Sequence, residues 1–209
     1  MQKLQPKAII DYNLLNHVCH DTRSPFNGLI GFSELLALNI HSITDDKKEE
    51  YANTIYNLAE KTQLSTHLLI AWIKLISGNF IPNNAIVSLQ QIVAKAIQYN
   101  ESEIQFKQIH LSAQIIDVEI EADSLYLPIA IGILLSMFFK NLPSGSTIQI
   151  EGSHPIIYIT AVTENQTIKS LVQFFHEESN EQDQHNYTVW VAKQILAAQS
   201  ALRVDLVIL

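Results

Sequence analysis

The sequence predicts a two-part fold in which a helical hairpin precedes a small α/β domain. Apolar residues between about residues 8 and 40 recur in steps of three and four, as on one side of a helix that packs against another helix. From about residue 86 onward, helical and strand patterns alternate, which indicates an α/β sandwich with a mixed sheet. The expected parts are residues 1–78, a linker at 79–84 and residues 85–209.

The first part is expected to be an antiparallel hairpin. Its first helix places Leu15, Val18, Leu29, Phe32 and Leu36 along an apolar seam. The polar break at residues 41–46 then supplies Thr44, Asp45 and Asp46, which suit the start of a second helix. That helix runs to about Ser77, where Gly78 can end it. A lone hairpin is too thin to bury both apolar stripes, so pairing with a second copy into a dimeric four-helix bundle is expected.

In the second part of the sequence, segments with helical periodicity alternate with segments that have the periodicity of strands. We expect helices at about 86–99, 124–141, 168–176 and 187–199, and strands at about 109–116, 146–151, 155–162 and 202–208. The polar, acidic stretch 176–186 is most simply a solvated loop.

Composition excludes several classes of function. The net charge of −8, with only 13 Lys and Arg, argues against nucleic acid and anionic membranes as partners. Cys19 is the single cysteine, so neither an internal disulfide nor a cysteine-based metal cluster is expected. The longest apolar run, residues 127–139, is shorter than the roughly 20 residues that cross a bilayer. A cytoplasmic protein that acts on proteins or small molecules is expected.

The segment HDTRSPFNGLIGFSELL, residues 20–36, carries the chemistry. At about 100° per residue, His20 lies about 180° from the midpoint of Val18 and Thr22 and so faces away from the seam. Ser24 and Asn27 lie within about 40° of it and complete a polar strip. A neutral imidazole is a good nucleophile near neutral pH, and the carboxylate of Asp21 can orient the ring or accept its proton.

This segment resembles the H-box of sensor histidine kinases, whose pattern is His, an acid, two variable or basic positions, a small polar residue, Pro, an apolar residue, then Asn or Gly. The resemblance implies that His20 carries phosphate, that Asp21 is its acid–base partner and that Ser24 helps to position water. Ser24 is less usual there than Thr or Asn, which leaves phosphatase activity open. Arg23 and Asn27 are expected to contact the partner protein.

The resemblance extends over nearly the whole chain, but it implies a degenerate ATPase domain. Where an active kinase has two asparagines on a helix, this chain has Ile133 and Met137, and only Lys140 is kept. Where the family has an adenine-binding Asp and two glycines, this chain has Thr163, Asn165 and Thr167. The glycine-rich turn before the last helix is replaced by Asn186, Tyr187, Thr188 and Trp190.

These replacements predict that the chain binds neither ATP nor another cofactor or metal, with magnesium expected only on the partner. Met137, Phe138 and Phe139 are expected to fill the former pocket as core. Asp123 matches a family acid at the head of a helix and is expected to be a structural cap.

The preferred hypothesis is a histidine phosphotransferase, or pseudo-histidine-kinase, of a two-component phosphorelay. His20 would exchange phosphate with the aspartate of a response-regulator receiver, with an upstream histidine kinase as a possible second partner, and the protein would be a homodimer. Two alternatives stay open: an active histidine kinase with a divergent ATP site, and a regulatory protein that grips a receiver without moving phosphate.

Overall fold

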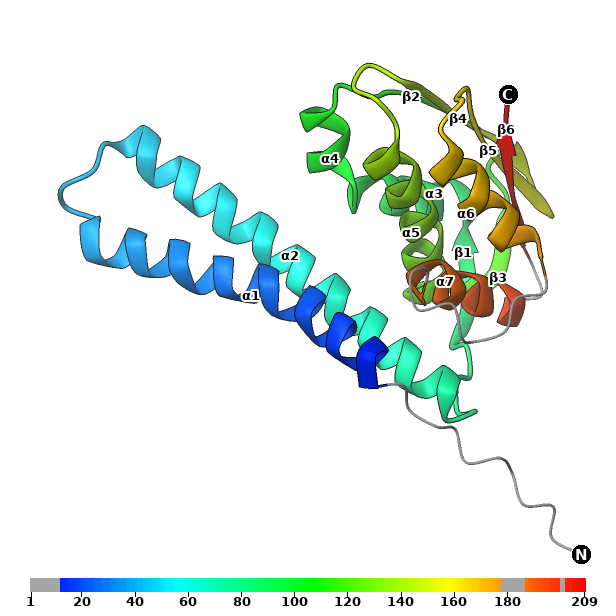
Figure 1. The fold of residues 1–209 in the computed structure, drawn as a ribbon, viewed down its shortest axis with the longest axis horizontal. Helices are drawn as coiled ribbons and strands as arrows, with labels where there is room; N and C mark the ends of the chain where they lie inside the picture. The colour runs from blue at the N-terminus through cyan, green and yellow to red at the C-terminus, as the bar shows by residue number, and fades with distance from the viewer. Residues whose placement is uncertain (1–11, 178–186, 200–201) are drawn as a thin grey trace, which may run out of the picture. The chain divides into compact units, whose positions relative to one another are not determined.

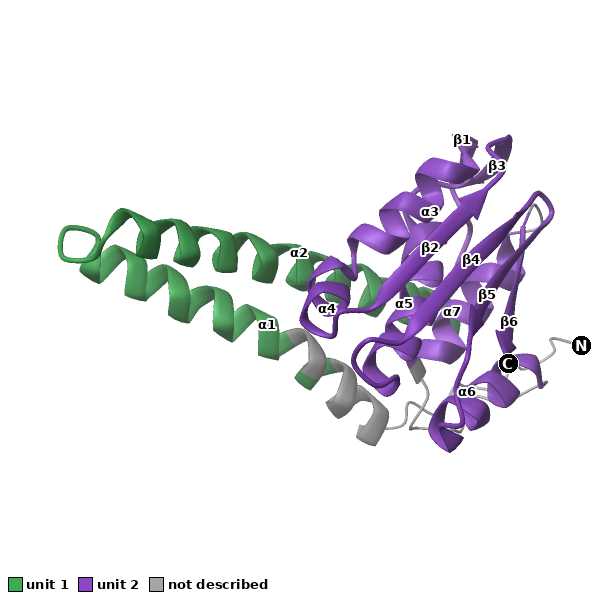
Figure 2. Cartoon of the chain, turned by 90° about the horizontal axis from the view of Figure 1, so that it is seen from above, with its two compact units in different colours: residues 1–77 green, residues 78–209 purple. Residues whose placement is uncertain are grey.

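The structure, a computed structural model, describes residues 12–177, 187–199 and 202–209 (Figure 1). The chain divides after residue 77 into two units, which are described separately (Figure 2).

The first unit is an antiparallel hairpin of α1 (Tyr12–Asn39) and α2 (Asp45–Ile76). Between them, the Oγ1 of Thr44 accepts a hydrogen bond from the main-chain N–H of Lys47, and Asp45 and Asp46 occupy the first turn. Gly78 follows α2 with a φ of 68°, a left-handed conformation that glycine adopts without strain. The predicted hairpin, its N-cap and its glycine stop are confirmed. Residues 8–11, where the first helix was expected to begin, lie outside the described residues.

The two helices pack closely around one glycine and one aromatic pair. A Cβ built on Gly28 would lie 3.1 Å from Cδ1 of Leu58 on α2. The rings of Phe32 and Tyr51 meet edge to face, with their centroids 5.7 Å apart. Both contacts lie on the seam side of α1, where the sequence pattern predicted the packing.

The second unit contains two sheets. The larger one has the strand order β2-β4-β5-β6, formed by β2 (His110–Ile115), β4 (Thr147–Ser153), β5 (Ile156–Ala161) and β6 (Arg203–Ile208). The pairs β2–β4 and β5–β6 are parallel, whereas β4–β5 is antiparallel, so the predicted mixed sheet is confirmed. The smaller sheet pairs β1 (Asn84–Ser88) with β3 (Glu119–Asp123) in antiparallel register.

Helices cover one face of the larger sheet (Figure 2). They are α3 (Leu89–Gln98), α4 (Glu101–Phe106), α5 (Tyr126–Asn141), α6 (Gln166–His176) and α7 (Tyr187–Ala198). α5 is the most deeply buried of them, with Leu134, Leu135, Phe138 and Phe139 fully inside. On β4 and β5, buried and exposed residues alternate, because successive side chains of a strand point to opposite faces.

Three elements differ from the prediction. A helix was expected from residue 86, but residues 84–88 form strand β1 and the helix begins at Leu89. Strand β3 and the short helix α4 were not predicted at all. The strands β1 and β3 stabilise each other across about thirty residues of sequence, and such non-local pairing leaves little trace in a local pattern.

Candidate functional site

The polar strip predicted from the sequence lies on the exposed side of α1. The side chains of His20, Arg23, Ser24 and Asn27 are all exposed. Leu29, Phe32 and Leu36 are half-buried on the seam, and Leu29 lies about 180° around the helix from His20. The imidazole of His20 therefore faces away from the packed side of the hairpin. The side chain of Asp21 lies outside the described residues.

A second, apolar strip runs along α1 beside the seam. Phe26 and Ile30 are each 49% exposed, and Ala37 is exposed on the same side. These residues lie about 80° to 120° around the helix from His20, so an apolar partner could cover them without covering the imidazole.

In the second unit, Asp123 is a structural cap, as predicted. Its side chain is 2% exposed, and its Oδ1 accepts hydrogen bonds of 2.9 Å from the main-chain N–H groups of both Leu125 and Tyr126 at the start of α5. Its Oδ2 accepts a 2.7 Å bond from the N–H of Asn83. The carboxylate thus holds the start of α5 and of β1 in place, and both of its oxygens have partners.

The residues that match the magnesium-binding helix of active kinases lie on α5 and are mostly core. Met137 is 5% exposed, Phe138 and Phe139 are fully buried, and Ile133 is half-buried. Only Lys140 is exposed. Apart from Lys140 and the half-buried Ser136, the side chains between residues 133 and 140 are apolar, and apolar side chains are poor ligands for magnesium.

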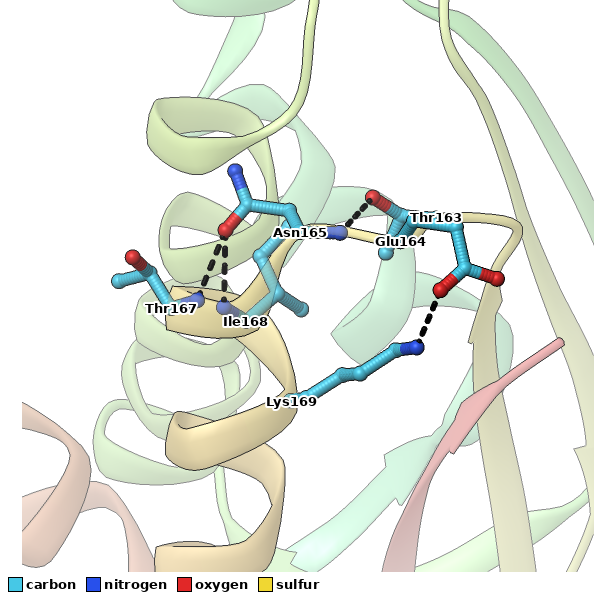
Figure 3. Close-up of polar contacts among 6 residues, drawn as sticks. All are labelled: Thr163, Glu164, Asn165, Thr167, Ile168 and Lys169. Atoms are coloured by element: carbon cyan, nitrogen blue, oxygen red, sulfur yellow. Dashed lines mark hydrogen bonds and ion pairs between the residues drawn. The ribbon is translucent and has the colours of Figure 1, made fainter.

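The segment after β5, which matches the adenine-binding and glycine-rich element, folds into a capped helix (Figure 3). The Oγ1 of Thr163 accepts a 3.1 Å hydrogen bond from the N–H of Asn165. The Oδ1 of Asn165 in turn accepts from the N–H groups of Thr167 and Ile168, at 2.9 and 3.3 Å, and so caps α6. Because of this cap, α6 begins at Gln166, two residues earlier than predicted.

An ion pair brackets the same turn. The ammonium of Lys169 lies 2.6 Å from Oε2 of Glu164, and its hydrogen bond and charge lower the pKa of that carboxyl below its usual range (Figure 3). Both side chains are partly or fully exposed, so the pair contributes little to stability.

Two side chains hold the end of α5: that of Asn165, which the sequence analysis named as a replacement of a glycine, and that of Lys107, which it did not name. The Nδ2 of Asn165 donates a 2.8 Å hydrogen bond to the carbonyl of Asn141, and the ammonium of Lys107 donates to the carbonyls of Lys140 and Leu142. Carbonyls at a helix C-terminus lack partners within the helix, so these side chains satisfy them. Asn165 could be predicted as an N-cap from its position, but its bond to Asn141 is tertiary.

The third replaced nucleotide element, the turn at the start of α7, lies only partly within the described residues. Asn186 lies outside the described residues, and so does the side chain of Tyr187 at the start of α7. Thr188 is half-buried and Trp190 is 9% exposed. Trp190, one of the residues that replace the glycine-rich turn, therefore packs into the domain.

The described residues contain neither a metal-binding cluster nor a helix that could cross a membrane. Within residues 12–177, 187–199 and 202–209, no three His, Cys, Asp or Glu side chains gather closely enough to hold a metal ion. Over the same part of the chain, none of the helices has both the length and the apolar character that a membrane crossing requires.

Comparison with known proteins gave one related sequence and several structural likenesses. No protein-family model matches the chain. The sensor protein KdpD of Clostridium acetobutylicum is 27% identical over 139 residues, which are 66% of this chain and 15% of that protein. This chain therefore spans a small part of the length of the relative that it matches.

Among solved structures, the histidine kinase AdeS of Acinetobacter baumannii aligns over 86% of each chain with 12% identity and a TM-score of 0.44. A histidine kinase of Burkholderia phymatum aligns over 87% of each chain with 11% identity and a TM-score of 0.41. The relationship of this chain to known proteins rests on the sequence match to KdpD and not on these TM-scores.

Proposed function

Since this chain is a relative of the sensor histidine kinases, we propose that it is a histidine phosphotransferase of a two-component phosphorelay. In this proposal His20 accepts phosphate from the aspartyl phosphate of a receiver domain and returns it to another. The observation that carries the proposal is the contrast between an exposed H-box strip on α1 and a nucleotide region whose polar groups bond to one another.

In the proposal, the reaction uses side chains of α1 together with the aspartyl phosphate and the magnesium ion of the receiver. A ring nitrogen of neutral His20 attacks phosphorus, a P–N bond forms, and the acyl phosphate P–O bond breaks to release the receiver's carboxylate. Asp21 is proposed to accept or hold the proton of the other ring nitrogen. The receiver's own magnesium ion would balance the charge on the phosphoryl group, so alignment is the main task of this protein.

Ser24, Arg23 and Asn27 are proposed to act beside His20. All three are exposed, and Ser24 lies one helical turn beyond His20 on the same side. In the proposal Ser24 positions groups at the phosphoryl site, while Arg23 and Asn27 contact the receiver. Arg23 is suited to this because a guanidinium binds phosphate and carboxylate through paired hydrogen bonds.

A homodimer is part of the proposal. The exposed strip of Phe26, Ile30 and Ala37 would be covered by a second hairpin in a four-helix bundle. Because that strip lies beside the seam and His20 lies opposite the seam, dimer formation would leave the imidazole accessible. Receivers and their phosphoryl donors act in the cytoplasm, where we propose that this protein acts as well.

The proposal also includes the loss of ATP binding. The side chain of Asn165 caps α6 and bonds to Asn141 where a kinase needs bare backbone to approach phosphate. Thr163, at the position of the adenine-binding acid, accepts a hydrogen bond from the N–H of Asn165. These contacts support a domain that no longer takes nucleotide and that serves instead in docking the partner.

The test is phosphate transfer from purified phosphorylated receivers. Wild-type protein should gain a label that is stable to alkali and lost in acid, as a phosphoramidate is, and His20→Gln should gain none. His41→Gln is the matched control, because His41 is another exposed histidine of the same hairpin, and it should be labelled like the wild type. Failure of every cognate receiver to label the wild type would refute the proposal.

The same proteins separate the alternatives. An active kinase would label His20 from ATP alone, without a receiver. A regulatory protein that only grips its receiver would bind it equally well as wild type and as His20→Gln, would never carry label, and would keep its effect in cells after that substitution.

A further inference from the structure

The outer edge of strand β2 is an open end of the larger sheet. The strand order places β2 and β6 at the two edges, and within the described residues β4 is the one strand that pairs with β2 (Figure 2). An unpaired edge presents a row of main-chain donors and acceptors that another strand can bind.

The hydrogen bonds of β2 identify which groups face outward. The N–H of His110 donates to Ser146 at 2.9 Å and that of Ile116 donates to Gly152 at 3.1 Å, both on the β4 side. Because main-chain groups alternate in direction along a strand, Leu111, Ala113 and Ile115 direct theirs away from β4. Among the described residues, no main-chain or side-chain hydrogen bond reaches these outward groups, and Ala113 is exposed.

On the opposite edge, at least one outward main-chain group is covered by a side chain. On β6 the N–H groups of Arg203 and Leu209 donate to the β5 side, so Leu206 directs its carbonyl outward. The Nε2 of His176 lies 3.0 Å from that carbonyl oxygen, and Leu206 is 3% exposed. β2, with the sequence HLSAQI, has no proline, glycine, lysine or carboxylate, which are the usual devices that keep an edge from pairing.

We propose that β2 pairs with β2 of a second copy, antiparallel about a two-fold axis at Ala113, to join the two sheets into one of eight strands. In this register Leu111 lies opposite Ile115 of the partner subunit, Ser112 opposite the partner's Gln114, and Ala113 opposite itself. Apolar residues meet apolar ones, the two polar side chains meet each other, and the smallest side chain lies on the axis. The strand carries no carboxylate, lysine or arginine that would repel its copy.

The pairing makes about six main-chain hydrogen bonds, two for each outward-facing pair. Its area is small compared with that of a stable interface, so association through β2 should depend on concentration. Strand β2 and His20 belong to different units of the chain, and the inference does not rest on the proposed phosphotransfer. If the hairpins also pair, each copy has two different two-fold interfaces, and tetramers or larger assemblies form.

Proline at position 113 gives a sharp test on the full-length chain. The N–H of Ala113 faces outward, so Ala113→Pro removes a donor that β2–β4 pairing does not use, and proline is tolerated at such edge positions. By sedimentation equilibrium over a wide concentration range, the wild type and the control Ala113→Ser should reach at least twice the mass of Ala113→Pro. The ratio should be two if the hairpins do not pair and two or more if they do, and it should be the same in a His20→Gln background.

A second variant keeps the backbone unchanged. Ala113→Asp places two carboxylates opposite each other on the axis and should also lower the limiting mass at least two-fold. This variant provides the test if circular dichroism shows that the proline variant is misfolded. Amide exchange should slow with concentration at Leu111, Ala113 and Ile115 and stay unchanged at Ser112 and Gln114. Equal masses for the wild type and a folded Ala113→Asp, or no concentration dependence of exchange at the three outward amides, would overturn the inference.

Discussion

The Nδ2 of Asn165 lies 2.8 Å from the main-chain oxygen of Asn141 and donates a hydrogen bond to it. The same side chain accepts bonds from the N–H groups of Thr167 and Ile168. One amide therefore satisfies three main-chain groups and links the end of α5 to the start of α6. Figure 3 shows the two bonds on the α6 side. The sensor histidine kinases that this chain resembles have a glycine at this position. Because glycine has no side chain, it would provide none of these contacts.

Asn165→Ala should lower the free energy of unfolding by about 2 kcal/mol, because it removes an N-cap and leaves the Asn141 carbonyl without its partner. Urea unfolding followed by circular dichroism measures this. The exposed neighbour Gln166 is the control, and Gln166→Ala should change stability by less than about 0.5 kcal/mol. Equal stability of the two variants would show that the link between α5 and α6 is unimportant.

Addition of Mg·ATP should leave the thermal midpoint of the wild type unchanged. A ligand at about 1,000 times its Kd stabilises a protein by about 4 kcal/mol, so millimolar ATP would clearly raise the midpoint of a protein that binds it with a Kd of about 1 μM. An active histidine kinase, run alongside, should show the shift. A midpoint that rises with ATP concentration would favour the active-kinase alternative.

The stability that Asp117 contributes should depend on pH. Its Oδ1 accepts hydrogen bonds from the Oγ of Ser88 at 2.7 Å and the N–H of Gln90 at 3.1 Å, and these lower the pKa of the carboxyl below its ordinary value of 3.8. A carboxyl whose pKa is lower in the folded state stabilises the fold above the unfolded pKa and loses that effect as pH falls through the folded pKa. The stability difference between the wild type and Asp117→Asn should therefore be full at pH 7 and shrink below about pH 3.8. Urea titrations from neutral to acid pH check this, and a difference that stays constant would contradict it.

Two glycines of α1 should respond differently to alanine. Gly31 has nothing within 4 Å of a built Cβ, so Gly31→Ala should stabilise the hairpin by about 1 kcal/mol through helix propensity. At Gly28 the added carbon would lie 3.1 Å from Leu58, and the shift that this side chain makes should offset much of the gain. Thermal unfolding of the two variants compares them, and a larger gain at Gly28 would refute the described packing.

The hairpin was predictable because its signals are local. Thr44, Asp45 and Gly78 mark helix ends, and the apolar steps of α1 identify its packed side before any contact is known. The exposure of His20, Ser24 and Asn27 followed from the same helical geometry. Their chemical roles stay predictions, since exposure alone does not make a histidine a phosphate carrier.

The second unit was predictable only where one element carries its own pattern. The strands β2, β4, β5 and β6 have clear signals, whereas β1 and β3 exist because they pair with each other at long range. In the nucleotide region, the sequence showed which residues are replaced, but not that Asn165 would reach Asn141. Contacts between side chains and distant carbonyls depend on the finished fold.

Localisation of the phosphoryl group tests the central claim most directly. After incubation with a phosphorylated cognate receiver and digestion at neutral to alkaline pH, mass spectrometry of the chain should find one phosphate, on His20. It should find none on His41, His110, His154 and His176, which are the other exposed histidines among the described side chains. Phosphate on a different residue, or equal labelling of His20→Gln, would contradict the account.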